Sequence, residues 1–142
     1  MSTEALCKLD IMEVMSRYAL ASDNKNYDSL RSLFSDDATI AMQFDSDFLG
    51  GQGVHFDDPA SFIAFVKETA TVYRASQHLL GNPLIDVDGE VASIRVNLIG
   101  TAFYQDTSTP DTTLYGFYEV ALTKMSGSWK IQKLTFTSIG SK

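Results

Sequence analysis

Two turn signals in the second half of the chain constrain its fold more than any other feature. Asp88-Gly89 and Ser126-Gly127 are dipeptides typical of tight β-hairpin loops. Apolar runs with strand character flank both turns, over residues 78–87 and 91–104 for the first and residues 112–125 and 129–139 for the second. The chain is therefore predicted to be β from residue 77 onward, as an antiparallel meander of long strands.

The first half of the chain has helical periodicity instead. Residues 4–22 carry an apolar stripe at spacings of three and four, flanked by Ile11 and Tyr18. The predicted stripe consists of Leu9, Met12, Met15, Ala19 and then Ser22 or Asp23. Asn26 is a suitable N-cap for a short second helix, and Asp58 with Pro59 predicts the start of a third. A short strand is expected between the second and third helices.

Composition narrows the class of protein. The 142 residues suit one domain, and the net charge of −7 with scattered lysines and arginines argues against nucleic acid as a partner. Since no apolar run approaches the roughly 20 residues of a membrane span, no membrane association is expected. The lone Cys7 and a start without secretion-signal character favour a cytoplasmic setting. No metal, flavin or nicotinamide signature is present, so no cofactor is expected.

Three segments carry a family resemblance: "RYALASDNKNYDSLRSLFSDDATI", "SQHLLGNPLIDVDGEVASIRV" and "GFYEVALTKMSGSWKIQKLTF". In this order they resemble the SnoaL-like domain of the nuclear transport factor 2-like superfamily, which includes polyketide cyclases and scytalone dehydratase. The resemblance covers nearly all of residues 1–142, taken as a single domain. It implies an α+β cone fold, a curved antiparallel sheet wrapped around N-terminal helices. It also implies a pocket for a small apolar or aromatic molecule.

Asp23 and His78 are the candidate catalytic residues. Asp23 lies four residues after Ala19, so helical geometry directs it along the apolar stripe, whereas an Asx-turn ending the helix is the alternative. His78 opens a strand and is suited to proton transfer near neutral pH, although a structural histidine would look the same. Family members carry a catalytic Asp and a pocket His at matching places, so the resemblance favours an Asp23–His78 pair. His55 is expected at the surface.

Aromatic residues are the candidate ligand contacts. Tyr18 is a third catalytic candidate, because its phenol could hold a substrate carbonyl as negative charge develops, and core packing with the hydroxyl in water is an equal alternative. Phe34, Phe65, Tyr115 and Tyr118 are candidate substrate-binding residues, and packing in the core is the alternative for each. Scytalone dehydratases use a second histidine on a central strand, which "IRVNLIGTAF" lacks. The Asp-Arg-Asp triad of limonene epoxide hydrolases is disfavoured as well, because alternation along the strand directs Arg95 outward.

Two classes of function remain open. One is a cofactor-independent lyase or isomerase (a dehydratase, an isomerase of the ketosteroid type or a cyclase) that uses Asp/His acid–base catalysis on a small, mostly apolar oxygenated molecule. The alternative is a non-catalytic ligand-binding or assembly subunit of the same fold, like the β-subunits of ring-hydroxylating dioxygenases. The expected outer face of residues 90–104 mixes polar and large apolar groups, namely Arg95, Asn97, Ile99 and Phe103. Sheets of this family usually pair back to back, so a homodimer through the sheet is expected.

Overall fold

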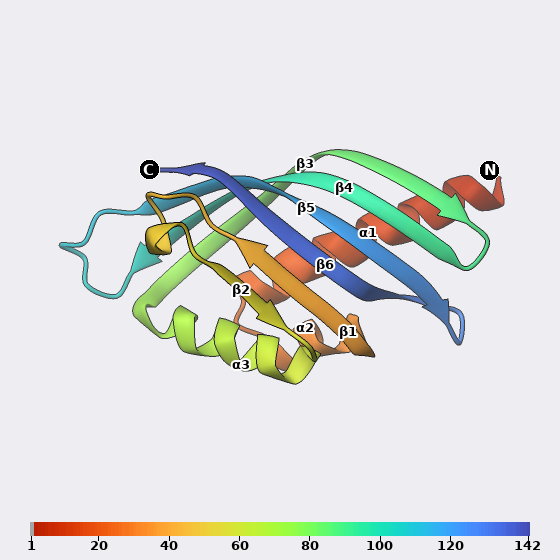
Figure 1. The fold of residues 1–142 in the computed structure, drawn as a ribbon, viewed down its shortest axis with the longest axis horizontal. Helices are drawn as coiled ribbons and strands as arrows, with labels where there is room; N and C mark the ends of the chain where they lie inside the picture. The colour runs from red at the N-terminus through yellow and green to blue at the C-terminus, as the bar shows by residue number, and fades with distance from the viewer. Residues whose placement is uncertain (1) are drawn as a thin grey trace.

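A computed structural model describes residues 2–142, except for the side chain of Leu49. A strongly curved sheet wraps one side of the long helix α1, and the shorter helices lie near one end of the sheet (Figure 1). The helices are α1 (Thr3–Asp23), α2 (Tyr27–Ser32) and α3 (Pro59–Thr69), with short 3-10 turns η1 (Leu49–Gly51) and η2 (Ala70–Val72). The strands are β1 (Phe34–Gln43), β2 (Gly53–Phe56), β3 (Tyr73–Asp88), β4 (Val91–Tyr104), β5 (Thr112–Met125) and β6 (Ser128–Ser141).

The sheet is mixed and open. Its strands run in the order β2-β1-β6-β5-β4-β3, so β2 and β3 form its two edges. The pairings from β3 through β6 are antiparallel and form the predicted meander, with Gly89 and Gly127 at positive φ in its two tight turns. The β1–β6 pairing is parallel, which differs from the purely antiparallel sheet expected. The long segment between β1 and β6 allows this arrangement, since a parallel neighbour requires a crossover connection.

The predicted stripe on α1 was partly wrong. Leu9 and Met12 are 52% and 41% exposed, whereas the helix buries another face. That face consists of Cys7, Ile11, Val14, Met15, Tyr18, Ala19 and Ala21. Because apolar residues occur all around this helix, periodicity alone could not choose the buried face. The order of the elements nevertheless matches the prediction, with Asn26 and Asp58 serving as N-caps of α2 and α3. The β region begins earlier than predicted, since β3 starts at Tyr73 and not at residue 77.

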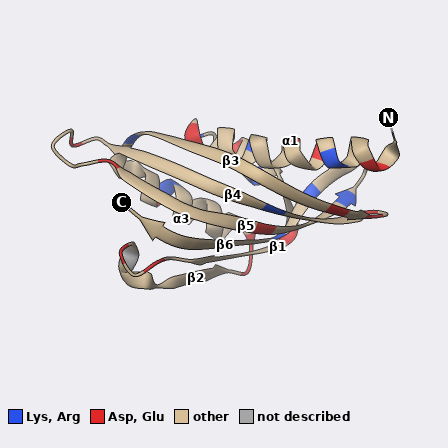
Figure 2. Ribbon diagram, turned by 90° about the horizontal axis from the view of Figure 1, so that it is seen from above, with Lys and Arg blue, Asp and Glu red and all other residues tan. Residues whose placement is uncertain are grey.

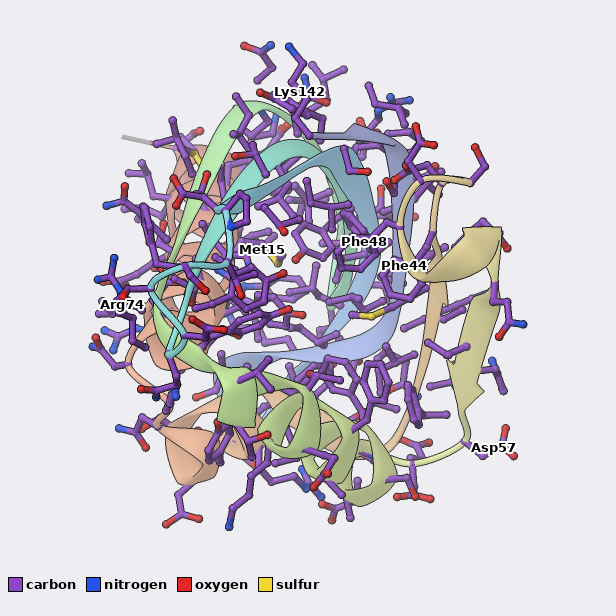
Figure 3. All side chains as sticks on the ribbon, turned by 90° about the vertical axis from the view of Figure 1, so that its left-hand side faces the viewer. Met15, Phe44, Phe48, Asp57, Arg74 and Lys142 are labelled. Atoms are coloured by element: carbon purple, nitrogen blue, oxygen red, sulfur yellow. The ribbon has the colours of Figure 1, made fainter. Side chains whose placement is uncertain are left out.

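The core lies between the concave face of the sheet and the helices. Figure 3 shows Met15, Phe44 and Phe48 inside this space, while Arg74 and Asp57 lie at the periphery.

Acidic and basic residues are interspersed along α1 in Figure 2. Among the helices of residues 2–142, none has the length and apolar character needed to cross a membrane.

Candidate active site

The turn after α1 shows whether the side chain of Asp23 is needed to end the helix. The amide of Asn26 donates to the carbonyl of Ala21 at 2.9 Å, and that of Lys25 donates to Ser22 at 3.2 Å. With Lys25 at φ +53, these bonds form a Schellman-type C-terminus that does not use the Asp23 side chain. Helix termination therefore leaves the Asp23 carboxylate available for contacts elsewhere.

The Asp23 carboxylate is held by β3. The Ser76 hydroxyl donates to Oδ1 at 3.1 Å and the backbone N–H of His78 donates to Oδ2 at 3.0 Å. The third contact joins His78 Nδ1 to Oδ1 at 2.5 Å. A carboxylate at a helix C-terminus is disfavoured by the helix dipole. Three donors from β3 compensate for this, and they place the charge beside the imidazole.

His78 lies where β3 forms the open edge of the sheet. Its backbone N–H points away from β4 toward Asp23, so the carboxylate also covers an otherwise unpaired edge amide. Since the carboxylate accepts at Nδ1, the proton of the neutral ring belongs on Nδ1 and the lone pair on Nε2. The His78 and Asp23 side chains are 25% and 16% exposed, so the pair is largely withdrawn from water.

Lys25 ties this turn to the beginning of β3. Its Nζ donates to the backbone carbonyl of Ala70 at 3.1 Å and to that of Tyr73 at 2.7 Å. The two segments that carry Asp23 and His78 are thus connected by a second set of bonds. Lys25 and Ser76 both lie in segments that carry the family resemblance, but neither was singled out from the sequence, because their roles depend on α1 lying against β3.

Tyr18 and Tyr118 lie deep in the core near the carboxylate. Their ring centroids are 5.5 Å apart, and both side chains are buried. Burial raises the pKa of the Tyr18 phenol, while Tyr118 partly opposes the shift. Burial also raises the pKa of Tyr118 well above its usual value, with further contributions from Tyr18 and the negative charge of Asp23. Both phenols therefore stay neutral and able to donate a hydrogen bond at physiological pH.

The other predicted ligand contacts are placed differently. Phe34 is buried and packs edge-on against Tyr18, with centroids 6.3 Å apart. Phe65 instead packs on Phe56 of the opposite edge strand β2. Tyr115, a candidate substrate-binding residue, lies on the opposite face of the sheet from Tyr118. It pairs with Ile99 on the outer face, because residues 115 and 118 are an odd number apart and alternate across the sheet.

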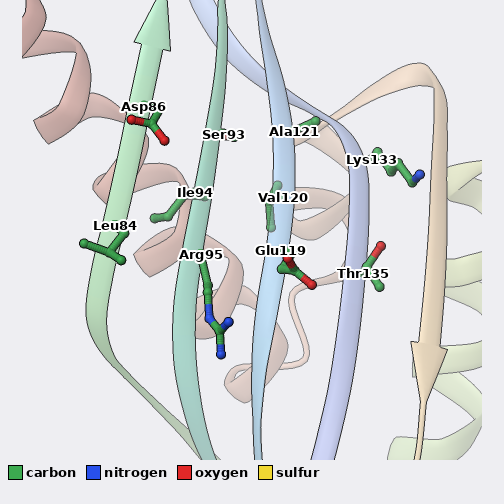
Figure 4. Close-up of a pocket in the computed structure, with 10 residues that line it drawn as sticks. All are labelled: Leu84, Asp86, Ser93, Ile94, Arg95, Glu119, Val120, Ala121, Lys133 and Thr135. Carbon is green, nitrogen blue, oxygen red and sulfur yellow. The ribbon is translucent and has the colours of Figure 1, made fainter.

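Two hollows lie on the outer face of the sheet, opposite to the helices. One is lined by residues of β3 to β6, including Asp86, Arg95, Glu119 and Lys133 (Figure 4). The other lies beside it and is largely apolar, with Leu79, Ile99, Tyr115, Phe117 and Ile139 among its lining residues. The Arg95 guanidinium stacks over Phe117, 4.0 Å from the ring centroid, which confirms that Arg95 points outward. An enclosed cavity beside His78 stays a prediction.

Metal-binding side chains are dispersed. Within residues 2–142, no group of three His, Cys, Asp or Glu side chains is arranged to hold a metal ion. His55 is exposed and pairs with Asp57, at 2.8 Å. Asp23 and His78 thus form the partly buried pair of ionisable side chains on which a proposal of chemistry rests.

The comparisons with known proteins agree with this fold. The sequence profile of the SnoaL-like domain matches residues 3–135, so the chain belongs to the SnoaL-like family. An uncharacterized protein of Mycobacterium tuberculosis is 33% identical over 89 residues, which is 63% of this chain and 56% of the relative. The chain therefore matches only about half the length of that relative.

Solved structures show the same architecture. A putative scytalone dehydratase from Novosphingobium aromaticivorans superposes with a TM-score of 0.85 at 21% identity, covering 99% of this chain and 89% of that one. A hexachlorocyclohexane dehydrochlorinase, LinA type 2, gives a TM-score of 0.79 at 13% identity, covering 98% and 89%. At these identities the likeness establishes the cone fold, as expected from the sequence, and leaves the reaction to be argued from the site.

Proposed function

We propose that the protein is a cofactor-independent lyase or isomerase in which His78 moves a proton on a small, mostly apolar oxygenated molecule. The observation that carries the proposal is the 2.5 Å contact between His78 Nδ1 and Asp23. It leaves Nε2 as the free base and puts a fixed negative charge behind the ring. This is the arrangement that general-base catalysis by histidine requires.

The chemistry follows from where charge develops. Nε2 of His78 takes a proton from a carbon next to a carbonyl, and the Asp23 carboxylate stabilises the resulting imidazolium. The negative charge moves to the carbonyl oxygen, where a buried neutral phenol, Tyr18 or Tyr118, donates a hydrogen bond. Return of the proton to a leaving hydroxyl gives dehydration, and return to another carbon gives isomerisation. Membership of the SnoaL-like family and the likeness to a putative scytalone dehydratase support this class.

The outer face of the sheet supports a second proposal, that the protein is a homodimer. Leu79 and Leu84 are 65% and 72% exposed, and Ile139 is also 72% exposed. These apolar side chains adjoin Arg95, Glu119 and Lys133, so the face carries both apolar area and charges of either sign. A two-fold contact could pair opposite charges while covering the leucines. If the chain were a non-catalytic assembly subunit, this same face would be its contact surface.

Isotope exchange tests the proposed chemistry without knowledge of the natural substrate. Small ketones and enones are incubated with the protein in D₂O, and proton NMR follows the loss of the C–H signal next to the carbonyl. Wild-type protein should accelerate exchange for at least some of these probes, and His78→Asn should abolish the acceleration. The matched control is His55→Asn, which alters the exposed histidine and should exchange like wild type. Equal exchange by wild type and His78→Asn would contradict the proposal.

A further inference from the structure

Gly100 lies in the middle of β4 at a position where the backbone does not require glycine. It pairs in regular register with His78 on one side and with Leu114 on the other. The register shifts of the β3–β4 pairing fall elsewhere, and Gly100 is not among the residues with positive φ. Glycine inside a strand weakens it and typically marks a bulge or a close approach. Neither a bulge nor a positive φ accounts for this glycine, so the atoms that a side chain at this position would meet are of interest.

A side chain at Gly100 would stand against the edge of the His78 ring that carries Nε2. A Cβ built on Gly100 would lie 3.7 Å from His78 Cδ2 and 3.9 Å from Nε2. The third nearest atom is Leu98 Cδ1, also at 3.9 Å. Because the backbone N–H of His78 donates outward to Asp23, His78 and Gly100 form the closer, non-hydrogen-bonded type of strand pair. A side chain at position 100 would thus stand directly beside the nitrogen that is to meet the substrate.

Gly116 shows what a glycine required by packing looks like in the same sheet. A Cβ there would lie 2.2 Å from the carbonyl oxygen of Thr137 and 2.9 Å from the Phe136 ring, so no larger residue fits. At Gly100 the same atom would make only ordinary van der Waals contacts. An alanine is therefore compatible with the fold at Gly100, and its absence leaves room next to Nε2.

We propose that Gly100 is a specificity-determining residue. Its lack of a side chain keeps the approach to His78 Nε2 open, and the room left there limits how branched a substrate can be next to the carbon that reaches Nε2. The inference rests on the proposed function and names the part of the substrate concerned. The nearest neighbours of a side chain at position 100 are the imidazole edge of His78 and the Leu98 side chain, so in this proposal they border the approach to Nε2. This approach suits a flat, apolar portion of a carbonyl compound lying against β4, with its acidic C–H directed at Nε2.

Chemical modification measures access to Nε2 directly. Diethyl pyrocarbonate acylates an accessible, unprotonated imidazole nitrogen, and peptide mass spectrometry separates His78 from His55. Gly100→Ala should slow modification of His78, and the larger side chain of Gly100→Val should slow it by at least roughly tenfold, the lower end of what one extra carbon costs at a tight site. His55 serves as the internal standard, since its side chain is 59% exposed. Gly81→Ala, with nothing within 4 Å of the added methyl group, is the matched control and should react like wild type.

Two readouts make the outcome decisive. Thermal unfolding and the nitrogen-15 spectrum of His78 check that the Gly100 variants fold and keep the proton on Nδ1. In deuterium exchange, Gly100→Ala should lose more kcat/KM for probes branched next to the reacting carbon than for unbranched ones, by about tenfold. Unchanged modification of His78 in folded Gly100→Val would overturn the inference. Absence of exchange in wild type would overturn the proposed function instead, because acylation requires no turnover.

Discussion

Replacing Asp23 by asparagine tests the site with the least change in shape. The carboxylate accepts the Ser76 hydroxyl and His78 Nδ1 on one oxygen and the His78 backbone N–H on the other. If the amide NH₂ replaced Oδ2, it would face that backbone N–H, and two opposed donors cost about 1–3 kcal/mol. The amide is therefore expected to turn its NH₂ toward Ser76 and Nδ1.

That orientation of the amide reverses the tautomer of the His78 ring. The Ser76 hydroxyl can rotate to accept, but His78 Nδ1 can accept from the amide only by losing its proton, which then moves to Nε2. The substitution thus blocks the proposed base as well as removing the charge that stabilises the imidazolium. Deuterium exchange should fall by about 10²–10⁴-fold, the range that general acid–base catalysis supplies. The unfolding free energy should fall by only about 1–2 kcal/mol, because the shape and most hydrogen bonds remain.

Nitrogen-15 NMR of the histidines and the exchange assay check this prediction together. In wild type at neutral pH, Nδ1 of His78 should carry the proton, and in Asp23→Asn it should be Nε2. Asp10→Asn is the control, since Asp10 lies on the exposed side of the same helix and should leave both readouts unchanged. An Asp23→Asn protein that keeps the wild-type tautomer and exchanges within about twofold would refute the assigned role of the carboxylate.

Four further outcomes are expected. Tyr118→Phe should reduce exchange by about 10²–10³-fold, because it removes the phenol that stabilises the oxyanion. Burial raises the pKa of Tyr118 and Tyr18 above the ordinary tyrosine value of 10.0, so in an alkaline melting series wild-type stability should be intact below pH 10.0 and fall above it. The Ser138 hydroxyl lowers the pKa of Asp45 from 3.8, so the ionised carboxylate stabilises the fold above that pH and the effect is lost in acid. Wild type should therefore melt at a higher temperature than Asp45→Asn near neutrality, with the difference vanishing toward pH 2. Sedimentation should give a dimer at micromolar concentration for wild type and a monomer for Leu84→Glu, whereas a wild-type monomer would contradict the proposed sheet contact.

Local sequence signals determined most of the architecture. The turns at Gly89 and Gly127 and the caps Asn26 and Asp58 depend on neighbouring residues alone, so they could be read without any tertiary information. The outward direction of Arg95 is also local, because successive side chains along a strand point to opposite faces of the sheet. That alternation also places Tyr115 and Tyr118 on opposite faces of the sheet, so these two candidate substrate-binding residues do not share one site.

Only the tertiary structure decided what the polar residues contact. Asp23 and His78 are 55 residues apart, and their contact exists because α1 packs along the open edge of β3. The same packing brings in Ser76 and Lys25, which no local pattern distinguishes from ordinary surface residues. The buried face of α1 and the empty side of Gly100 were likewise settled by neighbours distant in the chain. Periodicity specifies which residues share a face, but which face is covered depends on the element that packs against it.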